Sequence, residues 1–182
     1  MTKSNIVLYG FMFTGKSSVA RRISEKHGLE LVDTDLMIVD LEGATIEEVL
    51  QARGEVAFRG LERDLVREAS EKEGAVIATG AGVPSDARNL ELLGKNGVGI
   101  VLLAPPATIL TRMREAATER PLLKGIAELA RIQSMMADRR EAYGRIAKRI
   151  DTHGLPLDVV ERKVWDLFTQ ARGNAPLARP AR

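Results

Sequence analysis

The sequence predicts an α/β fold in which helices flank a parallel β-sheet. Apolar runs of strand length alternate with longer segments of helical period, a pattern typical of parallel strands joined by crossover helices. A glycine-rich loop separates the first of these strands from the first helix. With 182 residues, of which 45% are hydrophobic and 29% charged, the chain fits one globular domain. We expect this domain to occupy residues 1–172.

The N-terminal half contains two expected strands and three expected helices. The strands lie at 6–9 and 29–32, and the helices at 16–27, from residue 45 onward and at 56–72. Gly28 ends the first helix, because glycine readily adopts the left-handed conformation of a C-cap. Thr45 and Glu48 have the spacing of a capping box. The second strand runs into Asp33-Thr34-Asp35, which we expect to be extended, so that the two carboxylates share a face.

The C-terminal half adds three strands and three helices. The strands are expected at 75–78, 98–103 and 149–152, the helices near 108–117, over most of 126–148 and at 157–171, and a loop at 118–124. Residues 173–182 are rich in Ala, Pro and Arg without periodicity, so we expect a disordered tail there. The strands together predict a five-stranded sheet.

Composition and charge exclude several classes of function. The absence of cysteine rules out disulfides, zinc–thiolate sites and cysteine nucleophiles. The longest apolar stretch, 98–107, is too short to span a bilayer, and residues 1–4 do not resemble a signal peptide, so we expect a cytoplasmic protein with no membrane partner. The net charge of +2 comes from the three arginines beyond residue 170, so we expect no nucleic-acid partner. His27 and His153 lack metal-ligand spacing and are interpreted as surface residues.

The residues 10–17 match the phosphate-binding pattern G-x-x-x-x-G-K-[ST] between a strand and a helix. Glycines let the backbone curl so that several N–H groups converge on a phosphate, and the helix start adds its positive end. A lysine reaches the outer phosphates and a hydroxyl ligates Mg²⁺. The pattern predicts that nucleotide phosphates contact Gly10, Thr14, Gly15, Lys16, Ser17 and Ser18. The alternative interpretation is a glycine turn before an ordinary helix, and the lack of an N-K-x-D segment counts against a GTPase.

Further motifs follow the phosphate-binding loop in a distinctive order. They are Asp33-Thr34-Asp35, the run 54–62 (GEVAFRGLE), Thr79-Gly80-Ala81-Gly82, Arg120-Pro121-Leu122-Leu123 and Arg139-Arg140-Glu141-Ala142-Tyr143. In order and spacing, over about residues 5 to 170, this set resembles the shikimate kinase family. The resemblance implies a P-loop kinase fold of the nucleoside-monophosphate-kinase type. It also implies an enzyme that uses ATP and Mg²⁺ to phosphorylate the 3-hydroxyl of shikimate, giving shikimate 3-phosphate, in aromatic amino acid biosynthesis, and we expect a monomer.

The same resemblance assigns roles to individual residues. Arg59 and Arg139 match the arginines that bind the substrate carboxylate, for which a planar guanidinium is suited. Asp35 matches the carboxylate that holds the ring hydroxyls and orients or deprotonates the attacking one. Asp33, with Ser17, matches the acid near Mg²⁺. The segment 33–62 would therefore bind the acceptor.

Other matched positions surround these. Glu62 would lie one helical turn from Arg59 and fix its rotamer. Arg120 falls in a lid at about 113–126, whose closure would bring a cation to the developing charge and exclude water. The backbone of Gly80, Ala81 and Gly82 would lie against the acceptor. Pro156 falls near the adenine-binding loop, and Arg112 is a further candidate there.

Three residues depart from the family's pattern. Phe13 replaces a glycine of the loop, so its side chain must point away from the phosphates or crowd them. Ala81 replaces the middle glycine of a triplet, which would cost about 1 kcal/mol if φ were positive there. Val39 occupies a position where the family commonly has Glu. Two alternatives therefore stay open: a kinase of the same fold acting on another small polyol or hydroxy acid, and a nucleotide-binding homologue without transfer activity.

Overall fold

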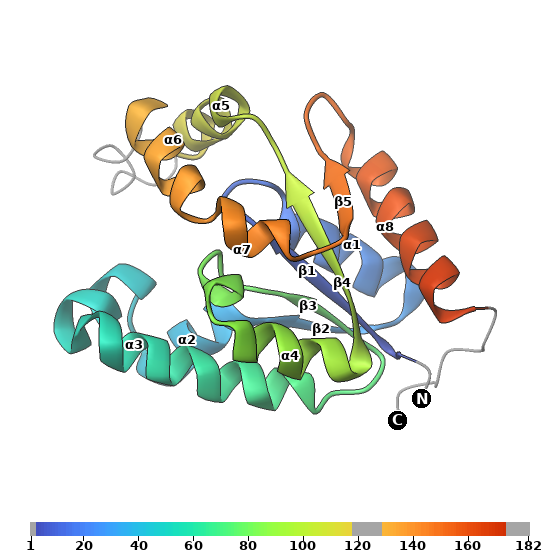
Figure 1. Cartoon of the computed structure of the whole chain (residues 1–182), viewed down its shortest axis with the longest axis horizontal. Helices are drawn as coiled ribbons and strands as arrows, with labels where there is room; N and C mark the ends of the chain where they lie inside the picture. Colours follow the sequence, from blue (N-terminus) through green and yellow to red (C-terminus); the bar gives the residue numbers. More distant parts are fainter. Residues whose placement is uncertain (1–2, 118–128, 174–182) are drawn as a thin grey trace.

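The computed structural model describes residues 3–117 and 129–173, which form a five-stranded parallel sheet flanked by helices (Figure 1). The strands are β1 (Asn5–Gly10), β2 (Glu30–Asp33), β3 (Ala75–Ala78), β4 (Gly97–Leu103) and β5 (Lys148–Asp151), in the sheet order β2-β3-β1-β4-β5. The helices are α1 (Lys16–His27), α2 (Thr34–Glu42), α3 (Ile46–Ser70), the short 3₁₀ helix η1 (Val83–Ser85), α4 (Ala87–Asn96), α5 (Pro106–Ala117), α6 (Leu129–Asp138), α7 (Arg140–Gly144) and α8 (Leu157–Arg172). The predicted fold class is confirmed.

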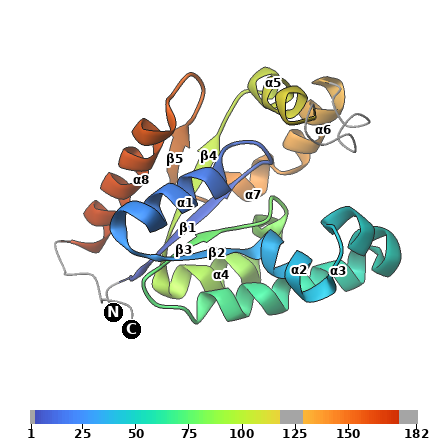
Figure 2. The same ribbon diagram turned by 180° about the vertical axis from the view of Figure 1, so that it is seen from behind.

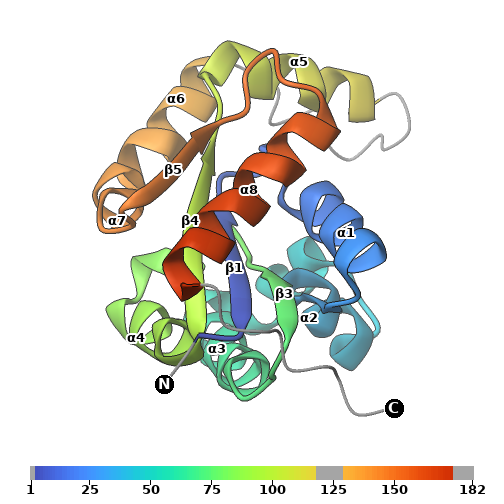
Figure 3. The same ribbon diagram turned by 90° about the vertical axis from the view of Figure 1, so that its right-hand side faces the viewer.

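The central strand β1 explains how the helices form two layers. All six of its residues are buried, because a middle strand of a parallel sheet is covered on both faces. Ile6 and Leu8 pack with α1 and α8, which lie together on one face (Figure 2). Val7 and Tyr9 point the opposite way and pack in the cluster that includes side chains of α3, α4 and α5. The sheet therefore lies between two helical layers, as the edge view also shows (Figure 3).

Two helices between β2 and β3 differ from the expectation. Residues 34–42 form α2 rather than an extended segment, because the Asp33 side chain accepts the backbone N–H groups of Asp35 and Leu36 as an N-cap. The predicted capping box of Thr45 and Glu48 starts α3. That helix continues through the two segments expected separately, with a kink at Gly54, whose φ of 75° and ψ of 164° are not helical.

The C-terminal half of the structure differs from the sequence-based expectation in three details. Helix α4 and η1 were not anticipated, and α5 begins at Pro106, two residues before the expected start, since proline suits the first turn of a helix. The segment expected to be mostly helical over 126–148 ends instead at Gly144, and within its described part α6 and α7 are separate helices. The expected tail at 174–182 and the stretch 118–128 of the expected lid and loop lie outside the described residues.

The interpretation of His27 as a surface residue was wrong. Its ring stacks on Trp165 with centroids 3.5 Å apart, and its Nε2 lies 2.7 Å from Oε1 of Glu161. Lys26 donates to the other oxygen of Glu161 at 2.7 Å, and the Glu161 side chain is fully buried. This cluster joins the end of α1 to α8. No helix in the described part of the chain is both long and apolar enough to cross a membrane.

Candidate active site

Because all five strands are parallel, the predicted site residues that follow β1, β2 and β3 lie at the same edge of the sheet. The phosphate-binding loop follows β1, Asp33 ends β2, and Thr79 follows β3. Because the carboxyl ends of parallel strands meet at one edge, these three segments are neighbours. The Thr79 N–H and hydroxyl both reach the Leu8 carbonyl oxygen of β1, and the Gly80 N–H donates to the Thr34 hydroxyl at 2.9 Å. The predicted phosphate and acceptor residues therefore belong to one site.

The loop at 10–15 has a backbone that needs its glycines. Gly10 and Gly15 have φ of 144° and 97°, and a Cβ on Gly10 would overlap the carbonyl oxygen of Leu102. Phe13 has a φ of 60°, the one positive value at a non-glycine residue in the described ranges. Its partly buried side chain packs against the core cluster that contains Phe11. This packing accounts for how a bulky residue is accommodated where the family usually has glycine.

Lys16 lies inside this loop rather than in solvent. The residue is only 9% exposed, and its Nζ donates to the Phe11 carbonyl oxygen at 2.9 Å. Burial lowers the pKa of Lys16 to about 8, and the carboxylates of Asp35 and Asp33 oppose that decrease. A buried cation next to a phosphate-binding loop suits a bound triphosphate, whose negative charge would raise the pKa of the lysine again.

Ser17 and Asp33 place two oxygen atoms side by side. The Ser17 hydroxyl donates to Oδ2 of Asp33 at 2.6 Å, while Oδ1 of the same carboxylate caps α2. No group of three or more His, Cys, Asp or Glu side chains arranged to hold a metal occurs among the described residues. Mg²⁺ nevertheless fits this pair, since it commonly takes one or two protein oxygens and completes its shell with water and substrate phosphates.

Asp35 lies in the first turn of α2 against the Gly80 backbone. A Cβ on Gly80 would come within 2.5 Å of Oδ1 of Asp35, so a side chain at that position would push the carboxylate away. Burial, followed by the neighbouring charge of Asp33, raises the pKa of Asp35 from 3.8 to about 6. Such a carboxyl accepts and releases a proton near neutral pH, as a general base requires.

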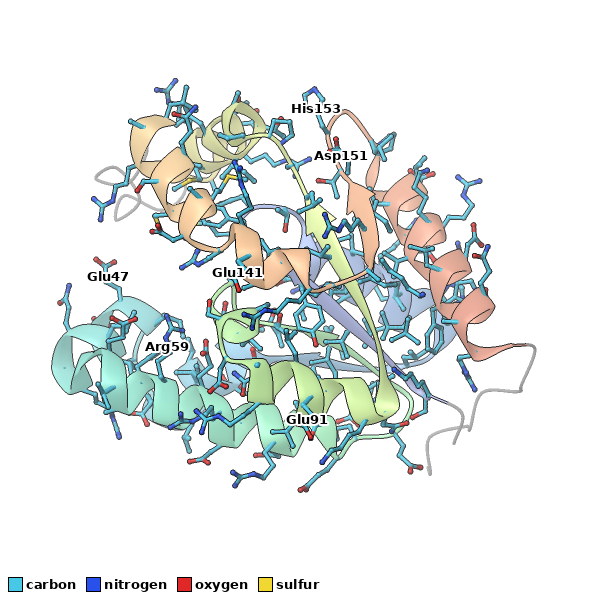
Figure 4. The ribbon with its side chains drawn as sticks, in the orientation of Figure 1. Glu47, Arg59, Glu91, Glu141, Asp151 and His153 are labelled. Carbon is cyan, nitrogen blue, oxygen red and sulfur yellow. The ribbon has the colours of Figure 1, made fainter. Side chains whose placement is uncertain are left out.

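Arg59 reaches the same place from α3, on the side of that helix that faces α7 (Figure 4). Its Nη1 donates to both carboxylate oxygens of Glu62 at 3.1 and 3.0 Å, which confirms the predicted pairing one helical turn apart. Glu62 is only 4% exposed, and burial raises its pKa although the Arg59 charge lowers it. The pair holds the guanidinium beside Gly82, where a Cβ would overlap Nη1.

Arg139 approaches from the junction of α6 and α7. Its guanidinium carbon lies 5.2 Å from the centre of the Phe11 ring, a cation–π contact that anchors the side chain next to the phosphate-binding loop. Its Nη1 is buried and donates to no acceptor of the described residues. A buried guanidinium nitrogen without an acceptor is costly, so this atom is suited to an anionic ligand.

Ala81 and Val39, the other two residues that depart from the family's pattern, lie in different parts of the structure. Ala81 does not have a positive φ, so the strain considered for it does not arise, and its carbonyl oxygen accepts the Tyr143 hydroxyl at 2.9 Å. Val39 is partly buried in α2, and its carbonyl oxygen accepts the N–H of Gly43, the glycine that ends the helix. No contact in the structure explains the choice of Val at position 39.

A cavity of about 350 Å³ adjoins the loop on the side of α8. It is lined by Phe13, Thr14, Gly15, Ser18, Val19, Arg112, Thr152, Leu155, Leu157 and Val160. Arg112 of α5 donates to the carbonyl oxygens of Phe13 at 2.9 Å and Thr152 at 3.1 Å, so it forms one wall. Pro156 is the N-cap residue of α8 and lies between two lining residues without lining the cavity itself.

The structure therefore brings together the predicted residues of both halves of the site. Sequence reasoning missed Thr152, whose backbone and hydroxyl hold Arg112, and Tyr143, which holds Ala81. Tyr143 was part of a quoted motif, and Thr152 directly follows the last strand, a position that could have indicated it. Arg120 lies outside the described residues, so the structure does not place it.

Comparisons with known proteins agree on one family. The family model described as shikimate kinase matches residues 12–167. Shikimate kinases of Geobacter metallireducens and Caldicellulosiruptor saccharolyticus are 41% and 39% identical to this chain over 160 residues, covering 88% of it and 89% and 92% of those proteins. A solved structure of shikimate kinase from Acinetobacter baumannii in complex with shikimate superposes with a TM-score of 0.84 at 29% identity, covering 94% of this chain and 96% of that one. A gluconokinase from Sinorhizobium meliloti, with a TM-score of 0.61 at 16% identity, shares the fold alone. The chain belongs to the shikimate kinase family.

Proposed function

We propose that this protein transfers the γ-phosphoryl group of ATP to the 3-hydroxyl of shikimate. One observation carries the proposal. Arg59 of α3 and Arg139, at the junction of α6 and α7, bring their charges close to the lysine of the phosphate-binding loop and to Asp35, a carboxyl with a raised pKa. The combination supplies two cations for the acceptor's carboxylate, a base for its hydroxyl and a cation for the phosphates. The family supports the same acceptor.

Binding of the acceptor relies on the two arginines. The unpartnered Nη1 of Arg139 and the guanidinium of Arg59 would each donate to the shikimate carboxylate, in place of solvent. Glu62 keeps Arg59 extended toward the site, which lowers the entropic cost of fixing that long side chain when the substrate binds. Gly80 and Gly82 leave room for the side chains of Asp35 and Arg59, the two residues that would hold the acceptor beside them.

The chemical step needs a proton acceptor and a stabiliser of charge. Asp35 would take the proton of the shikimate 3-hydroxyl. The hydroxyl oxygen would form a bond to the γ-phosphorus of ATP while the bond between that phosphorus and the ADP oxygen breaks. Lys16 would donate to the phosphate oxygens, where negative charge accumulates. We assign a second cation, Arg120, to the same charge when the lid closes. Phosphoryl transfer depends mainly on such positioning, because the reacting groups supply the covalent chemistry themselves.

Ser17 and Asp33 are the residues that we propose for Mg²⁺. Both offer hard oxygen atoms, and the ion would neutralise charge on the phosphates when bound. The 350 Å³ cavity beside the loop is the proposed place of the adenine ring, with the guanidinium of Arg112 on one side and the apolar residues Leu155 and Leu157 on another. Pro156 would then shape the turn that carries these residues rather than contact the base.

A coupled assay of ADP release from MgATP tests the proposal. Turnover with shikimate, and at least about 100-fold lower kcat/KM with quinate, gluconate and nucleoside monophosphates, is the expected result. An acceptor whose anionic group and reacting hydroxyl are arranged differently cannot contact Arg59, Arg139 and Asp35 in the reactive geometry. Turnover with gluconate but not with shikimate would show that the acceptor is gluconate and not shikimate. Saturable ATP binding without turnover on any of them would remove the kinase assignment. Lys16→Met, the matched inactive variant, should abolish transfer.

Two further assignments complete the proposal. We propose that the protein acts as a monomer, because a single copy of the chain is sufficient to bring the phosphate-binding and acceptor-binding residues together. Sedimentation equilibrium with and without substrates tests this. We also propose that it works in the cytoplasm, where ATP is regenerated. Fractionation of the source cells followed by immunodetection tests that assignment.

A further inference from the structure

A second and larger cavity, of about 610 Å³, is lined by residues of β4, β5, α5, α6 and α7. Helices α6 and α7 lie on the other side of β4 and β5 from α8 (Figure 1). We call this cavity the α6–α7 pocket. It is lined by Leu103, Pro106, Gln133, Met136, Ala137, Arg140, Tyr143, Gly144 and Arg149. None of these residues lines the nucleotide cavity, and none is among the residues assigned to shikimate, ATP or Mg²⁺. The proposed reaction therefore leaves this pocket without a role.

The walls of the pocket combine an apolar surface with positive charge. Leu103, Pro106 and Met136 provide the apolar part, together with the ring of Tyr143. Two arginines provide the charge, and no Asp or Glu is present among the described residues that line it. An apolar hollow with a few convergent polar groups is the usual form of a small-molecule site, and the volume falls within the usual range of about 300–1,000 Å³. The charge favours an anion.

The two arginines are available to a ligand in different ways. Arg140 is exposed and forms no hydrogen bond or ion pair with the residues that the structure describes. Arg149 donates through Nε to the Ile146 carbonyl oxygen at 3.2 Å and through Nη2 to that of Gly144 at 2.8 Å. These two hydrogen bonds hold the Arg149 side chain in place, and because both partners are neutral carbonyls, neither of them is a counter-ion. One guanidinium is thus fixed at the pocket and the other is free to close on a ligand.

The pocket is also linked to the acceptor site through α7. Arg140 follows Arg139, whose guanidinium lies over the Phe11 ring. Tyr143 lines the pocket with its ring, while its hydroxyl donates to the Ala81 carbonyl oxygen at 2.9 Å. A ligand packed against Tyr143 and paired with Arg140 would therefore restrain the short helix that connects to two acceptor-binding segments.

We propose that the α6–α7 pocket binds a small monocarboxylate with a ring-sized apolar body, and that this ligand alters the affinity of the enzyme for its acceptor. The carboxylate pairs with Arg140, since a planar guanidinium can contact both oxygens, and the ring lies against Met136 and Tyr143. The coupling follows from the position of α7 between the pocket and the acceptor site, and it rests on the acceptor site proposed above.

Calorimetric titration with 3-phenylpropionate tests the binding. The enzyme is first saturated with shikimate and ADP, so that Arg59, Arg139 and the nucleotide cavity are occupied. We expect 3-phenylpropionate to bind to this complex, and 3-phenylpropanamide, its neutral analogue, to bind at least about tenfold more weakly because a charge-assisted contact is lost. Equal affinities for acid and amide, or no binding to the saturated enzyme, would overturn the proposal.

Two variants locate the site. Arg140→Gln should weaken 3-phenylpropionate about tenfold, and Ala137→Trp should prevent binding by filling the pocket while leaving turnover without the ligand unchanged. Arg162→Gln is the matched control, because Arg162 is an exposed arginine of α8 with one weak contact, 3.9 Å from Asp158. An unchanged affinity in both pocket variants, or an equal loss in the control, would place the ligand elsewhere.

Steady-state kinetics test the coupling. In the wild-type enzyme, 3-phenylpropionate should change the KM for shikimate with a smaller change in kcat, and this change should disappear in Ala137→Trp. A competitive effect that persists in Ala137→Trp would mean that the compound acts in the shikimate site, and binding without any change in KM would overturn the coupling. Because these assays contain shikimate as the working substrate, failure of shikimate turnover itself would be recognised separately.

Discussion

The guanidinium of Arg59 lies so close to Gly82 that a methyl group on this glycine would overlap Nη1. The atom that would be displaced is the end of a long, flexible side chain, so the enzyme could relieve the overlap by moving Arg59 and would lose little stability. We expect Gly82→Ala to raise the KM for shikimate at least about tenfold, because one charge-assisted contact with the carboxylate weakens. The KM for ATP should change much less.

Gly94→Ala is the matched control for this substitution. Gly94 lies within α4, and a Cβ there would meet no atom within 4 Å. Alanine is preferred to glycine in a helix by up to about 1 kcal/mol, so this variant should be slightly more stable and kinetically unchanged. Equal KM values for shikimate in wild type and Gly82→Ala would show that Arg59 does not hold the acceptor.

Arg139 should act on the acceptor rather than on ATP. Removing its guanidinium in Arg139→Ala takes away the buried Nη1 and the contact with the Phe11 ring. We expect the KM for shikimate to rise by about 10- to 100-fold, with kcat reduced less, because most of the loss is in binding. Arg162→Ala, which removes an exposed arginine of α8 that lies 3.9 Å from Asp158, serves as the control. A normal KM in Arg139→Ala would contradict the carboxylate role.

The pH dependence of kcat/KM should reflect Asp35 and Lys16. Burial raises the pKa of Asp35 to about 6, and its carboxylate form is needed to accept the proton, so activity should fall as pH decreases through this value. Burial lowers the pKa of Lys16 to about 8, and its charged form is needed at the phosphates, so activity of the free enzyme should also fall above that value. A rate profile measured at constant ionic strength should therefore be bell-shaped.

The raised pKa of Asp35 also predicts how the stability of the protein depends on pH. Asp35 binds a proton more tightly in the folded chain, with a pKa of about 6, than in the unfolded chain, at 3.8. Between these two values the folded state holds more protons, so stability decreases as pH rises through this window. Asp35→Asn should remove that part of the pH dependence and be more stable than wild type at pH 7 by roughly 1 to 3 kcal/mol. Urea unfolding at pH 4 and pH 7 measures the difference, and a larger gain at pH 4 would contradict it.

Glu161 should be important for stability. Its side chain is fully buried between Lys26 of α1 and the stacked His27, so removing the carboxylate leaves two donors without their acceptor. We expect Glu161→Ala to lower the free energy of unfolding by roughly 2 to 4 kcal/mol. The control, Asp64→Ala, removes an exposed ion pair with Arg67 and should cost less than about 0.5 kcal/mol. Similar losses in the two variants would argue against a special role of the buried cluster.

Much of the site could be predicted from the sequence because its residues follow strands that the hydrophobic pattern identifies. Lys16 and Ser17 follow the first strand, Asp33 the second and Gly80 the third, and parallel strands bring these ends together. Helix α2 escaped prediction because an Asp-Thr-Asp segment is typical of a loop as well as of a helix start. Only the structure shows the Asp33 oxygen accepting the N–H groups of Asp35 and Leu36.

Other features depend on contacts between distant segments. The sequence gives no sign that His27 stacks on Trp165, because 138 positions separate them and only the packing of α8 on α1 brings them together. The same holds for Tyr143 and Ala81, which are 62 positions apart. Local patterns can identify the chemistry of a residue, but such pairings require the tertiary fold. The role of Arg120 stays a prediction.

Arg112 connects three parts of the chain that are separate in sequence: helix α5, the phosphate-binding loop at Phe13 and the turn after β5 at Thr152. Both carbonyl oxygens face one rigid, planar group, so the loop and the turn are held at a set separation before a nucleotide arrives. The walls of the cavity that we propose for the base are therefore preorganised, and less ordering of the protein would be required on binding. Any displacement of α5 near Arg112 would move both walls of the cavity together. The affinity for nucleotide should therefore depend on the position of α5, although this helix is not part of the phosphate-binding loop.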